Sequence, residues 1–285
     1  EFVIKTVNNS AENKYIRRAS LNRTVLNKPW FRQADLAAGG MLELVMGPVP
    51  NLKWGSNPAD SPPSMSTRLT PEETKTIMAY DKYAEDLAAW NQALRAYYYH
   101  KKEHFESLPN TPNEIIFLGN SITDNCEWWE LFSNPNIKNR GIGGDDTDGI
   151  LERLDEVTES NPSKIFIMIG TNDLSNGKSV EYIVGNYRRI IERIRQSSPG
   201  TRIYIQSVLP TDDGIHYTRR NTEIIRINDH LKDIATENGL TYIDLFNIFQ
   251  TENHKLNPQY SIDGLHLNGR GYLLWKDAII KYVEE

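Results

Sequence analysis

The chain has 285 residues, of which 39% are hydrophobic and 25% are charged, and it carries a formal net charge of −6. This size and composition fit a soluble protein with a sizeable core. The negative charge, with no basic stretch to offset it, argues against nucleic acid as a partner, and no apolar run is long enough to cross a bilayer. The single cysteine, Cys126, excludes an intramolecular disulfide, and we expect it to be a small buried hydrophobe.

Residues 1–64 predict a small β-rich segment. Apolar stretches at 1–6, 14–21 and 41–46 alternate with clusters of turn-forming residues, as expected for short strands. The segment resembles the C-terminal end of the β-sandwich in family 92 glycoside hydrolases, which are α-mannosidases. The matching runs are 7–13, 39–42, 46–48, 50–55 and 60–64. Because this stretch lacks the helical catalytic barrel of that family, we expect an accessory sheet and no mannosidase activity.

The first residues contain neither the basic region nor the apolar region of a secretory signal peptide. We therefore expect either a mature protein whose leader has been removed or a piece of a longer glycan-degrading protein. The expected location is the periplasm or the extracellular space.

Residues 65–108 predict a linker followed by a long amphipathic helix. The linker is rich in Pro and Ser, and Thr70, Pro71 and Glu73 then provide the start signals of a helix. Apolar residues recur along the predicted helix 71–107 at spacings of three and four. This seam consists of Tyr80, Tyr83, Leu87, Trp90, Leu94 and Tyr97. We expect the seam to be buried against the β-rich segment, against the C-terminal domain or against a second copy of the chain in an oligomer.

Two runs are similar to metal sites, and we expect neither to bind a metal. His100 and His104 fit the His-x-x-Glu-His pattern of inverted zinc peptidases, but the segment is a charged helix end and no third ligand follows. The acidic run 145–149 is similar to a calcium-binding loop, yet it places Ile150 where such a loop needs glycine. We expect Asp145 to lie near the entrance of an active site instead.

Residues 109–285 predict an α/β domain. Strand-like apolar runs alternate with helical patterns along this part of the chain, which implies right-handed crossovers and a parallel sheet covered on both faces. We expect a five-stranded parallel sheet in a three-layer α/β/α sandwich. Four strands are expected at 115–119, 164–170, 202–208 and 240–245, and a fifth strand is expected to end within 139–145. The main helices are expected at 180–197, 222–238 and 271–283.

Residue types used in acyl transfer follow three of these strands. Ser121 comes directly after the first one, in a Gly-Asn-Ser turn at the edge where parallel sheets place their ligands. Gly144 and Asn172 follow two others, and a glycine N–H and a side-chain amide are donor types of oxyanion holes. Asp263 precedes His266 by three residues, a spacing that lets the carboxylate hold one ring nitrogen of a general base. Each match alone also fits an ordinary turn or helix cap, but their combination favours catalysis.

These segments resemble the sequence blocks of the SGNH (GDSL-type) hydrolase family. The Gly-Ile-Gly-Gly-Asp run at 141–145 is similar to its acetylesterase and platelet-activating-factor acetylhydrolase-like branch. The resemblance covers about 109–285 and implies a flavodoxin-like fold. The roles that it implies are a catalytic triad of Ser121, His266 and Asp263 and an oxyanion hole made by the Ser121 N–H, Gly144 and Asn172. Asn120 departs from the Gly-Asp-Ser of the family, but the replaced aspartate is not the triad acid.

The expected reaction is hydrolysis of short-chain esters through an acyl-enzyme, with no metal or organic cofactor. The favoured substrate is an O-acetylated carbohydrate, such as a sialic acid or another glycan. Trp128, Trp129 and the loop 211–221 are expected to flank the site. A lipid or phospholipid acetylhydrolase and a non-catalytic carbohydrate-binding protein are the alternatives.

Overall fold

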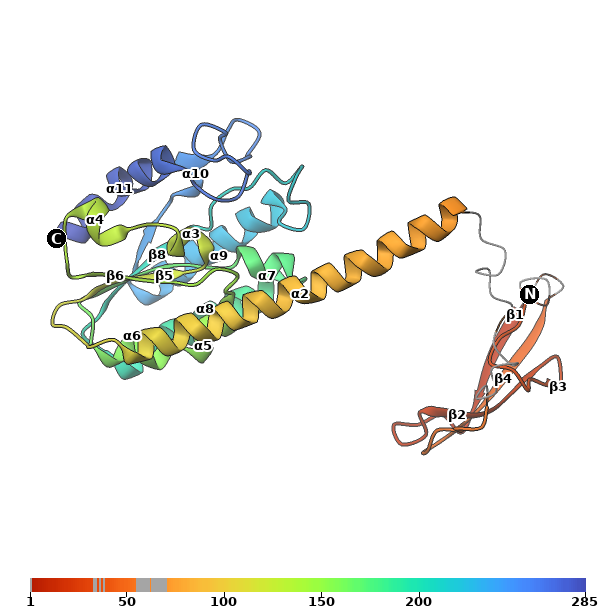
Figure 1. Ribbon diagram of the computed structural model, residues 1–285. Helices are drawn as coiled ribbons and strands as arrows, with labels where there is room; N and C mark the ends of the chain where they lie inside the picture. Colours follow the sequence, from red (N-terminus) through yellow and green to blue (C-terminus); the bar gives the residue numbers. More distant parts are fainter. Residues whose placement is uncertain (1, 33–34, 36, 38, 55–61, 63–70) are drawn as a thin grey trace. The chain divides into compact units, whose positions relative to one another are not determined.

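The computed structural model describes residues 2–32, 35, 37, 39–54, 62 and 71–285. The chain divides into two compact units, Glu1–Asp86 and Leu87–Glu285 (Figure 1). The predicted linker at 65–70, with the predicted N-cap Thr70, lies outside the described residues. The domain boundaries placed after residues 64 and 108 stay predictions.

The first unit contains a four-stranded sheet in the order β1-β4-β2-β3. Its strands are β1 (Phe2–Val7), β2 (Tyr15–Leu21), β3 (Thr24–Val25) and β4 (Gly40–Gly47). Strand β1 runs parallel to β4, whereas β2 runs antiparallel to both β3 and β4. The predicted β-rich segment is thus confirmed, although β3 is too short to show a pattern in the sequence. The resemblance to family 92 glycoside hydrolases stays a prediction.

The second unit is built on a parallel sheet of five strands in the order β6-β5-β7-β8-β9. The strands are β5 (Ile115–Gly119), β6 (Ile137–Gly141), β7 (Lys164–Met168), β8 (Arg202–Gln206) and β9 (Thr241–Ile243). Every residue of β5 and β7 is buried, which agrees with their largely apolar sequences and with a sheet covered on both faces. The five-stranded parallel sheet predicted from the sequence is confirmed.

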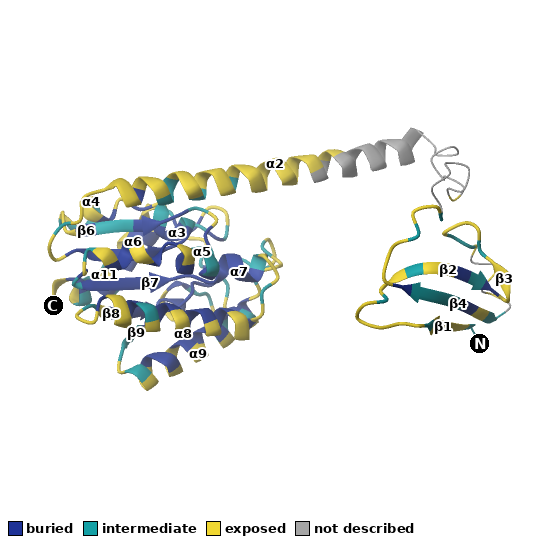
Figure 2. Ribbon diagram, turned by 90° about the horizontal axis from the view of Figure 1, so that it is seen from below, coloured by how far each residue is buried: buried dark blue, intermediate teal, exposed yellow. Residues whose placement is uncertain are grey.

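Helices cover both faces of this sheet, as Figure 1 shows. They are α3 (Ser121–Asp124), α4 (Trp128–Phe132), α5 (Thr147–Glu152), α6 (Leu154–Glu159), α7 (Thr171–Ser175), α8 (Val180–Ser197), α9 (Asn221–Asn238), α10 (Phe246–Phe249) and α11 (Gly269–Glu284). Helices α5, α6, α8 and α9 pack on the face that carries Ile116 and Leu118, whereas α4 and α11 pack on the face of Ile115 and Phe117. The three-layer α/β/α sandwich is therefore confirmed, and Figure 2 shows its sheet as the buried centre.

The sheet face under α4 and α11 carries a cluster of aromatic rings. Trp128 stacks on Phe117 with ring centroids 4.2 Å apart and meets Trp275 edge to face at 4.9 Å. Because Trp128 is only 1% exposed, the expectation that it flanks the active site is wrong, and its ring belongs to the core. Its Nε1 donates to the carbonyl of Thr123 at 2.8 Å, which holds α3 in place. Cys126 lies in the same cluster, as expected, and burial raises the pKa of its thiol to about 12.

Helix α2 (Pro71–Ser107) has the predicted length, and its last turns belong to the second unit. The side that packs on this unit carries Leu94, Tyr98, Lys101 and Phe105. Phe105 is 6% exposed, and its ring centroid lies 4.7 Å from the guanidinium carbon of Arg140. The Tyr98 hydroxyl donates to the carbonyl of Gly149 at 2.9 Å. Neither α2 nor any other helix in the described part of the chain is long and apolar enough to cross a membrane.

The described members of the expected seam before Leu94 do not pack on the second unit, and burial against the β-rich segment or a second copy of the chain stays a prediction. Leu87 is 45% exposed and Trp90 is 62% exposed; the side chains of Tyr80 and Tyr83 lie outside the described residues.

From Leu94 the packed side continues at Tyr98, one residue after the seam position Tyr97, with spacings of four and three. Tyr97 is 39% exposed but still reaches this unit through its hydroxyl, which donates to Asp124 at 2.7 Å. The packed side includes Lys101, whose acidic partner Asp124 lies 23 positions away. A search for apolar spacing in the sequence could therefore not reveal this side of the helix.

Replacing Phe105 with Ala should lower the free energy of unfolding of the second unit by about 2–4 kcal/mol, because a buried ring leaves a cavity. Replacing Trp90 with Ala should change it by less than about 0.5 kcal/mol, because that ring lies largely in solvent. Urea denaturation followed by circular dichroism measures both values. Equal losses in the two variants would contradict the packing of α2 described above.

Candidate active site

The chain turns from β5 into α3 at Asn120, and Ser121 is the first residue of that helix. The Asn120 side chain accepts a hydrogen bond from the Ile122 N–H at 3.1 Å and so caps α3. No side chain would fit at Gly119, because a Cβ there would lie 2.6 Å from the carbonyl oxygen of Met168. Since asparagine and aspartate cap helices about equally well, Asn120 keeps the cap that the family's aspartate would provide.

Ser121, His266 and Asp263 form a hydrogen-bonded chain. Ser121 Oγ lies 2.9 Å from His266 Nε2, and His266 Nδ1 lies 2.7 Å from Asp263 Oδ2. Because a carboxylate only accepts hydrogen bonds, Nδ1 of the neutral ring carries the proton and the Nε2 lone pair faces the serine hydroxyl. The structure thus brings together a serine and a histidine that are 145 positions apart in the sequence.

The Asp263 carboxylate is held in its charged form. Burial opposes its ionisation, but hydrogen bonds from the His266 ring and from the backbone N–H groups of His266 and Leu265 outweigh burial and hold the pKa of Asp263 well below its usual value. The two backbone groups donate to Oδ1 at 2.8 Å and 3.0 Å. Asp263 is consequently ionised at any pH at which a histidine could serve as a base.

Gly144 and Asn172 follow the strands on either side of β5. In the sheet order β6-β5-β7, Gly144 comes after β6 and Asn172 lies in α7 after β7, so both share the sheet edge that carries Ser121. Gly144 has a φ of +82°, which favours glycine, and Leu94 of α2 lies 3.2 Å from where a Cβ would be. Within the described part of the chain, the N–H groups of Ser121 and Gly144 donate to no protein acceptor.

Two partners orient the Asn172 amide. Its Nδ2 donates to the backbone oxygen of Asp145 at 2.8 Å, and its Oδ1 accepts from Arg219 Nη2 at 3.2 Å. Since a guanidinium only donates and a carbonyl only accepts, these partners fix which end of the amide is the oxygen. The second Nδ2 hydrogen is left for another acceptor. The sequence did not point to Arg219, because nothing near it marks a contact 47 residues away.

Asp145 is buried, so its expected place at the site entrance is wrong. It is 4% exposed, and its carboxylate pairs with the Arg153 guanidinium at 2.8 Å. Arg153 also donates to the carbonyls of Gly119 and Arg140, at 3.2 Å and 2.9 Å. The acidic run suggested a solvated loop, but the ion pair with Arg153 places its first carboxylate, that of Asp145, in the interior. Arg153 in turn connects the ends of β5 and β6.

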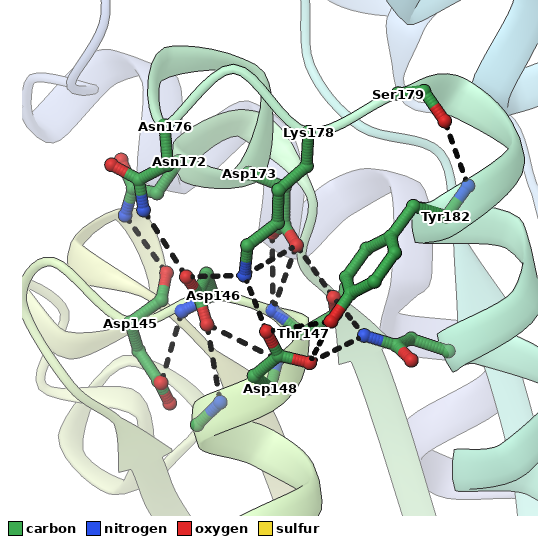
Figure 3. A network of polar contacts seen from close by, with 12 residues as sticks. Asp145, Asp146, Thr147, Asp148, Asn172, Asp173, Asn176, Lys178, Ser179 and Tyr182 are labelled. Atoms are coloured by element: carbon green, nitrogen blue, oxygen red, sulfur yellow. Dashed lines mark hydrogen bonds and ion pairs between the residues drawn. The ribbon is translucent and has the colours of Figure 1, made fainter. Parts of the chain in front are cut away.

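A polar network joins the segment after β6 to the segment after β7 (Figure 3). Lys178 Nζ lies 2.7 Å from a carboxylate oxygen of Asp146 and of Asp148, and 3.6 Å from one of Asp173. Asp173 is fully buried and also accepts from the backbone N–H and the hydroxyl of Thr147. The acidic run was visible in the sequence, but its pairing with Lys178 was not, because Lys178 lies 30 to 32 positions after Asp148 and Asp146.

Neither run that is similar to a metal site provides a complete ligand set. Among the described residues, no group of three or more His, Cys, Asp and Glu side chains is arranged to hold a metal ion. His100 and His104 occupy exposed positions on α2, and Asp146 and Asp148 pair with Lys178.

The loop 211–221 contacts two of the predicted site residues. His216 Nε2 lies 2.9 Å from the backbone oxygen of Asp263, and Arg219 contacts Asn172. Large apolar side chains are exposed on this loop and beside Asp263, namely Ile215 at 61%, Tyr217 at 76% and Ile262 at 92%. The place of Trp129 beside the site stays a prediction.

Residues 117–274 match the model of the GDSL-like lipase/acylhydrolase family. The chain belongs to this family. It is an ester hydrolase of the SGNH type, as the sequence resemblance predicted. The matched part contains the predicted site residues Ser121, Gly144, Asn172, Asp263 and His266.

The chain is similar to the platelet-activating factor acetylhydrolase IB subunit alpha1 of Bos taurus, with 28% identity over 166 residues, or 56% of this chain and 70% of the relative. It is also similar to a structure from Streptococcus pneumonia named for platelet activating factor, with 26% identity, a TM-score of 0.66 and coverage of 70% of this chain and 99% of that chain. An acetyl-xylooligosaccharide esterase from Geobacillus has 18% identity and a TM-score of 0.51, covers 62% of this chain and 97% of its own, and shows the shared fold alone.

Replacing Lys178 with Met should lower the free energy of unfolding by about 2–3 kcal/mol at neutral pH, because the buried Asp173 then lies beside Asp146 without a cation. Replacing Arg226 with Met should cost less than about 0.5 kcal/mol, because its ion pair with Glu181 is exposed. Chemical denaturation of both variants, followed by circular dichroism, tests this difference. A Lys178 variant as stable as the Arg226 variant would show that the network adds nothing to stability.

The cost of removing Lys178 should shrink in acid. Burial opposes ionisation of Asp148, but hydrogen bonds from Lys178, Tyr182 and Asn186 hold its pKa below the usual value, so its stabilising contribution is present above about pH 4 and is lost as the pH falls through the folded-state pKa. Burial raises the pKa of Asp173, so acid removes its buried charge sooner. The stability gap to the native protein should therefore be largest at neutral pH and narrow below about pH 4. A gap that widens in acid would contradict this charge arrangement.

Proposed function

We propose that the chain hydrolyses short-chain acyl esters, acetyl esters above all, with Ser121 as the nucleophile. The observation that carries the proposal is the hydrogen-bonded chain from Ser121 through His266 to Asp263 at the edge of the sheet. This is the arrangement by which an imidazole removes the proton of a serine hydroxyl. Membership of an acylhydrolase family and similarity to proteins named acetylhydrolases support the acetyl ester.

In the proposed reaction, Ser121 Oγ attacks the ester carbonyl carbon while His266 Nε2 accepts the hydroxyl proton. Asp263 holds the ring and stabilises the imidazolium that forms. The N–H groups of Ser121 and Gly144 and the remaining Nδ2 hydrogen of Asn172 receive the negative charge on the carbonyl oxygen. The imidazolium then protonates the departing alcohol, and an acyl-serine is left. Water attacks that ester by the same route, which releases the acid and restores the serine.

The proposed substrate is an O-acetylated sugar, sialic acids among them. Asp212 and Asp213 pair with Lys255 beside the site and make that part of its rim polar, which suits an alcohol rich in hydroxyl groups. The exposed Tyr217 offers a ring with an apolar face and a polar end, which suits a sugar. The resemblance of the N-terminal segment to mannosidases also favours glycans.

A lipid ester is the second candidate. Ile262 precedes Asp263 in the sequence and is almost completely exposed, and Ile215 is exposed on the neighbouring loop. Both line a pocket of about 470 Å³ together with Leu256 and Pro258, and the charged Asp212 and Lys255 line it as well. Exposed apolar surface of this kind suits contact with an acyl chain.

Replacing Ser121 with Ala should abolish ester hydrolysis while the protein stays folded, because no other group in the proposed reaction attacks the carbonyl. Turnover of a fluorogenic acetyl ester, with circular dichroism as the check on folding, measures both outcomes. A non-catalytic carbohydrate-binding protein would show no turnover even before the substitution. A folded Ser121 variant with near-normal turnover would overturn the assignment of the nucleophile.

Acetyl esters of sugars should be cleaved faster than esters with acyl chains of eight or more carbons, because the polar rim favours a hydroxyl-rich alcohol over a long apolar chain. The measurement is kcat/KM for acetylated sugars and for matched long-chain esters. The Ile215→Ser and Ile262→Ser variants provide the control, since they should leave sugar acetates unaffected. A preference for long chains that these variants remove would establish the lipid ester instead.

A further inference from the structure

Arg219 is a cation without a carboxylate partner. In the described part of the chain it forms no salt bridge, and its Nε atom is buried without a hydrogen-bond partner. The guanidinium hydrogen bond that the structure shows runs from Nη2 to Asn172 Oδ1 at 3.2 Å. Arginine stays protonated in proteins, and a charge that leaves solvent is normally paired, whereas the partly buried Arg219 has no carboxylate partner among the described residues. An isolated guanidinium at this place therefore requires an explanation.

The backbone that carries Arg219 is anchored on both sides. Its carbonyl accepts from Thr211 Oγ1 at 2.8 Å, and its N–H donates to the carbonyl of His216 at 2.8 Å. Asn221 exchanges two hydrogen bonds with the backbone of Thr211, at 2.9 Å and 2.8 Å, and both of these residues are buried. The loop thus fixes the backbone from which the Arg219 side chain extends, and the hydrogen bond to Asn172 directs its guanidinium.

We propose that Arg219 is a positioning residue of the oxyanion hole and acts through Asn172. Its hydrogen bond to Oδ1 orients the amide, and its charge draws electron density toward that oxygen, which strengthens Nδ2 as a donor. The Asp145 carbonyl takes one Nδ2 hydrogen, so the other is the one presented to the substrate. This inference rests on the proposed function, because it takes Asn172 as a donor to the oxyanion.

The geometry favours this role over recognition of an anionic group on the substrate. The Nε atom is buried and Nη2 is engaged with Asn172, so only Nη1 is left for contact with an anionic group. The negative charge that the Asn172 amide would contact is that of the oxyanion, which forms on the substrate only during the reaction. In a site of low dielectric constant, an unpaired cation behind the donor stabilises that charge and not the neutral ester. Arg219 should therefore affect kcat and leave KM nearly unchanged.

The first experiment compares two neighbouring arginines. With a neutral aryl acetate, Arg219→Met should lower kcat by about 10- to 100-fold and change KM by less than about twofold. Arg220→Met is the matched control, because Arg220 is adjacent and exposed, and its kcat should stay within about twofold of the native value. Arg219→Gln keeps a hydrogen-bond donor without the charge and should lie between the two. If Arg219→Met fails to fold, Arg219→Gln and Arg219→Lys provide the same comparison.

The second experiment asks whether Arg219 acts through Asn172. Asn172→Ala alone should lower kcat by about 10²–10³-fold. In that background Arg219→Met should add less than about twofold, because the amide on which it acts is gone. Fully additive losses would overturn the inference. A loss confined to the KM of an aryl acetate that bears a carboxylate would also overturn it and assign Arg219 to anion recognition.

The two levels of the proposal fail in different ways. If the proposed function is wrong, either the native protein shows no turnover or the Ser121→Ala protein keeps it. If only the present inference is wrong, turnover depends on Ser121 but the Arg219 variants are as fast as the Arg220 control.

Discussion

The arrangement of the site depends on one buried ion pair, between Arg153 and Asp145. Both side chains are 1% exposed. Arg153 reaches the carbonyls of Gly119 and Arg140 at the ends of β5 and β6, and the backbone oxygen of Asp145 accepts from Asn172 after β7. A buried pair of this kind gains little net stability, because both charges lose their hydration. Its contribution is geometric, since one guanidinium sets the relative positions of three segments that must meet at the substrate.

A second support comes from α2, which lies outside the α/β sandwich. Asp124, three residues after Ser121, accepts from the Tyr97 hydroxyl at 2.7 Å, from Lys101 at 2.8 Å and from the N–H of Gly143 at 3.0 Å. One carboxylate therefore connects the helix of the candidate nucleophile, the loop that leads to the candidate oxyanion donor and the last turns of α2. These turns are part of the hydrolase unit in energetic terms, because Asp124 loses two of these three hydrogen bonds without them.

The parts of the site that the sequence revealed are those with a local signature. Ser121 follows an apolar strand in a Gly-Asn-Ser turn, and Asp263 and His266 lie three residues apart, so secondary structure alone places them at one sheet edge. Lys178 and Arg219 carry no such mark. Each is an ordinary charged residue whose hydrogen-bond partners lie 30 or more positions away, and only the folded chain shows these pairings.

The packing of the aromatic residues shows the same limit. A tryptophan close to a candidate nucleophile in the sequence fits a substrate platform and a core position equally well, because both need a large ring. The structure shows that Trp128, the first residue of α4, belongs to the core, where its ring stacks on Phe117. The strands and helices themselves were predictable, because apolar runs and helical spacing are properties of a few consecutive residues.

The surroundings of Cys126 make the protein convenient for spectroscopy. It is the single cysteine of the chain, it is 5% exposed, and burial raises the pKa of its thiol to about 12. Because the thiolate is the species that reacts with maleimides and iodoacetamides, the native fold hides its own cysteine from these reagents. A cysteine introduced at an exposed position, for example in place of Tyr217, would then be the main target of a fluorophore or spin label. Movement of the loop beside the candidate site could be followed without first removing the native thiol.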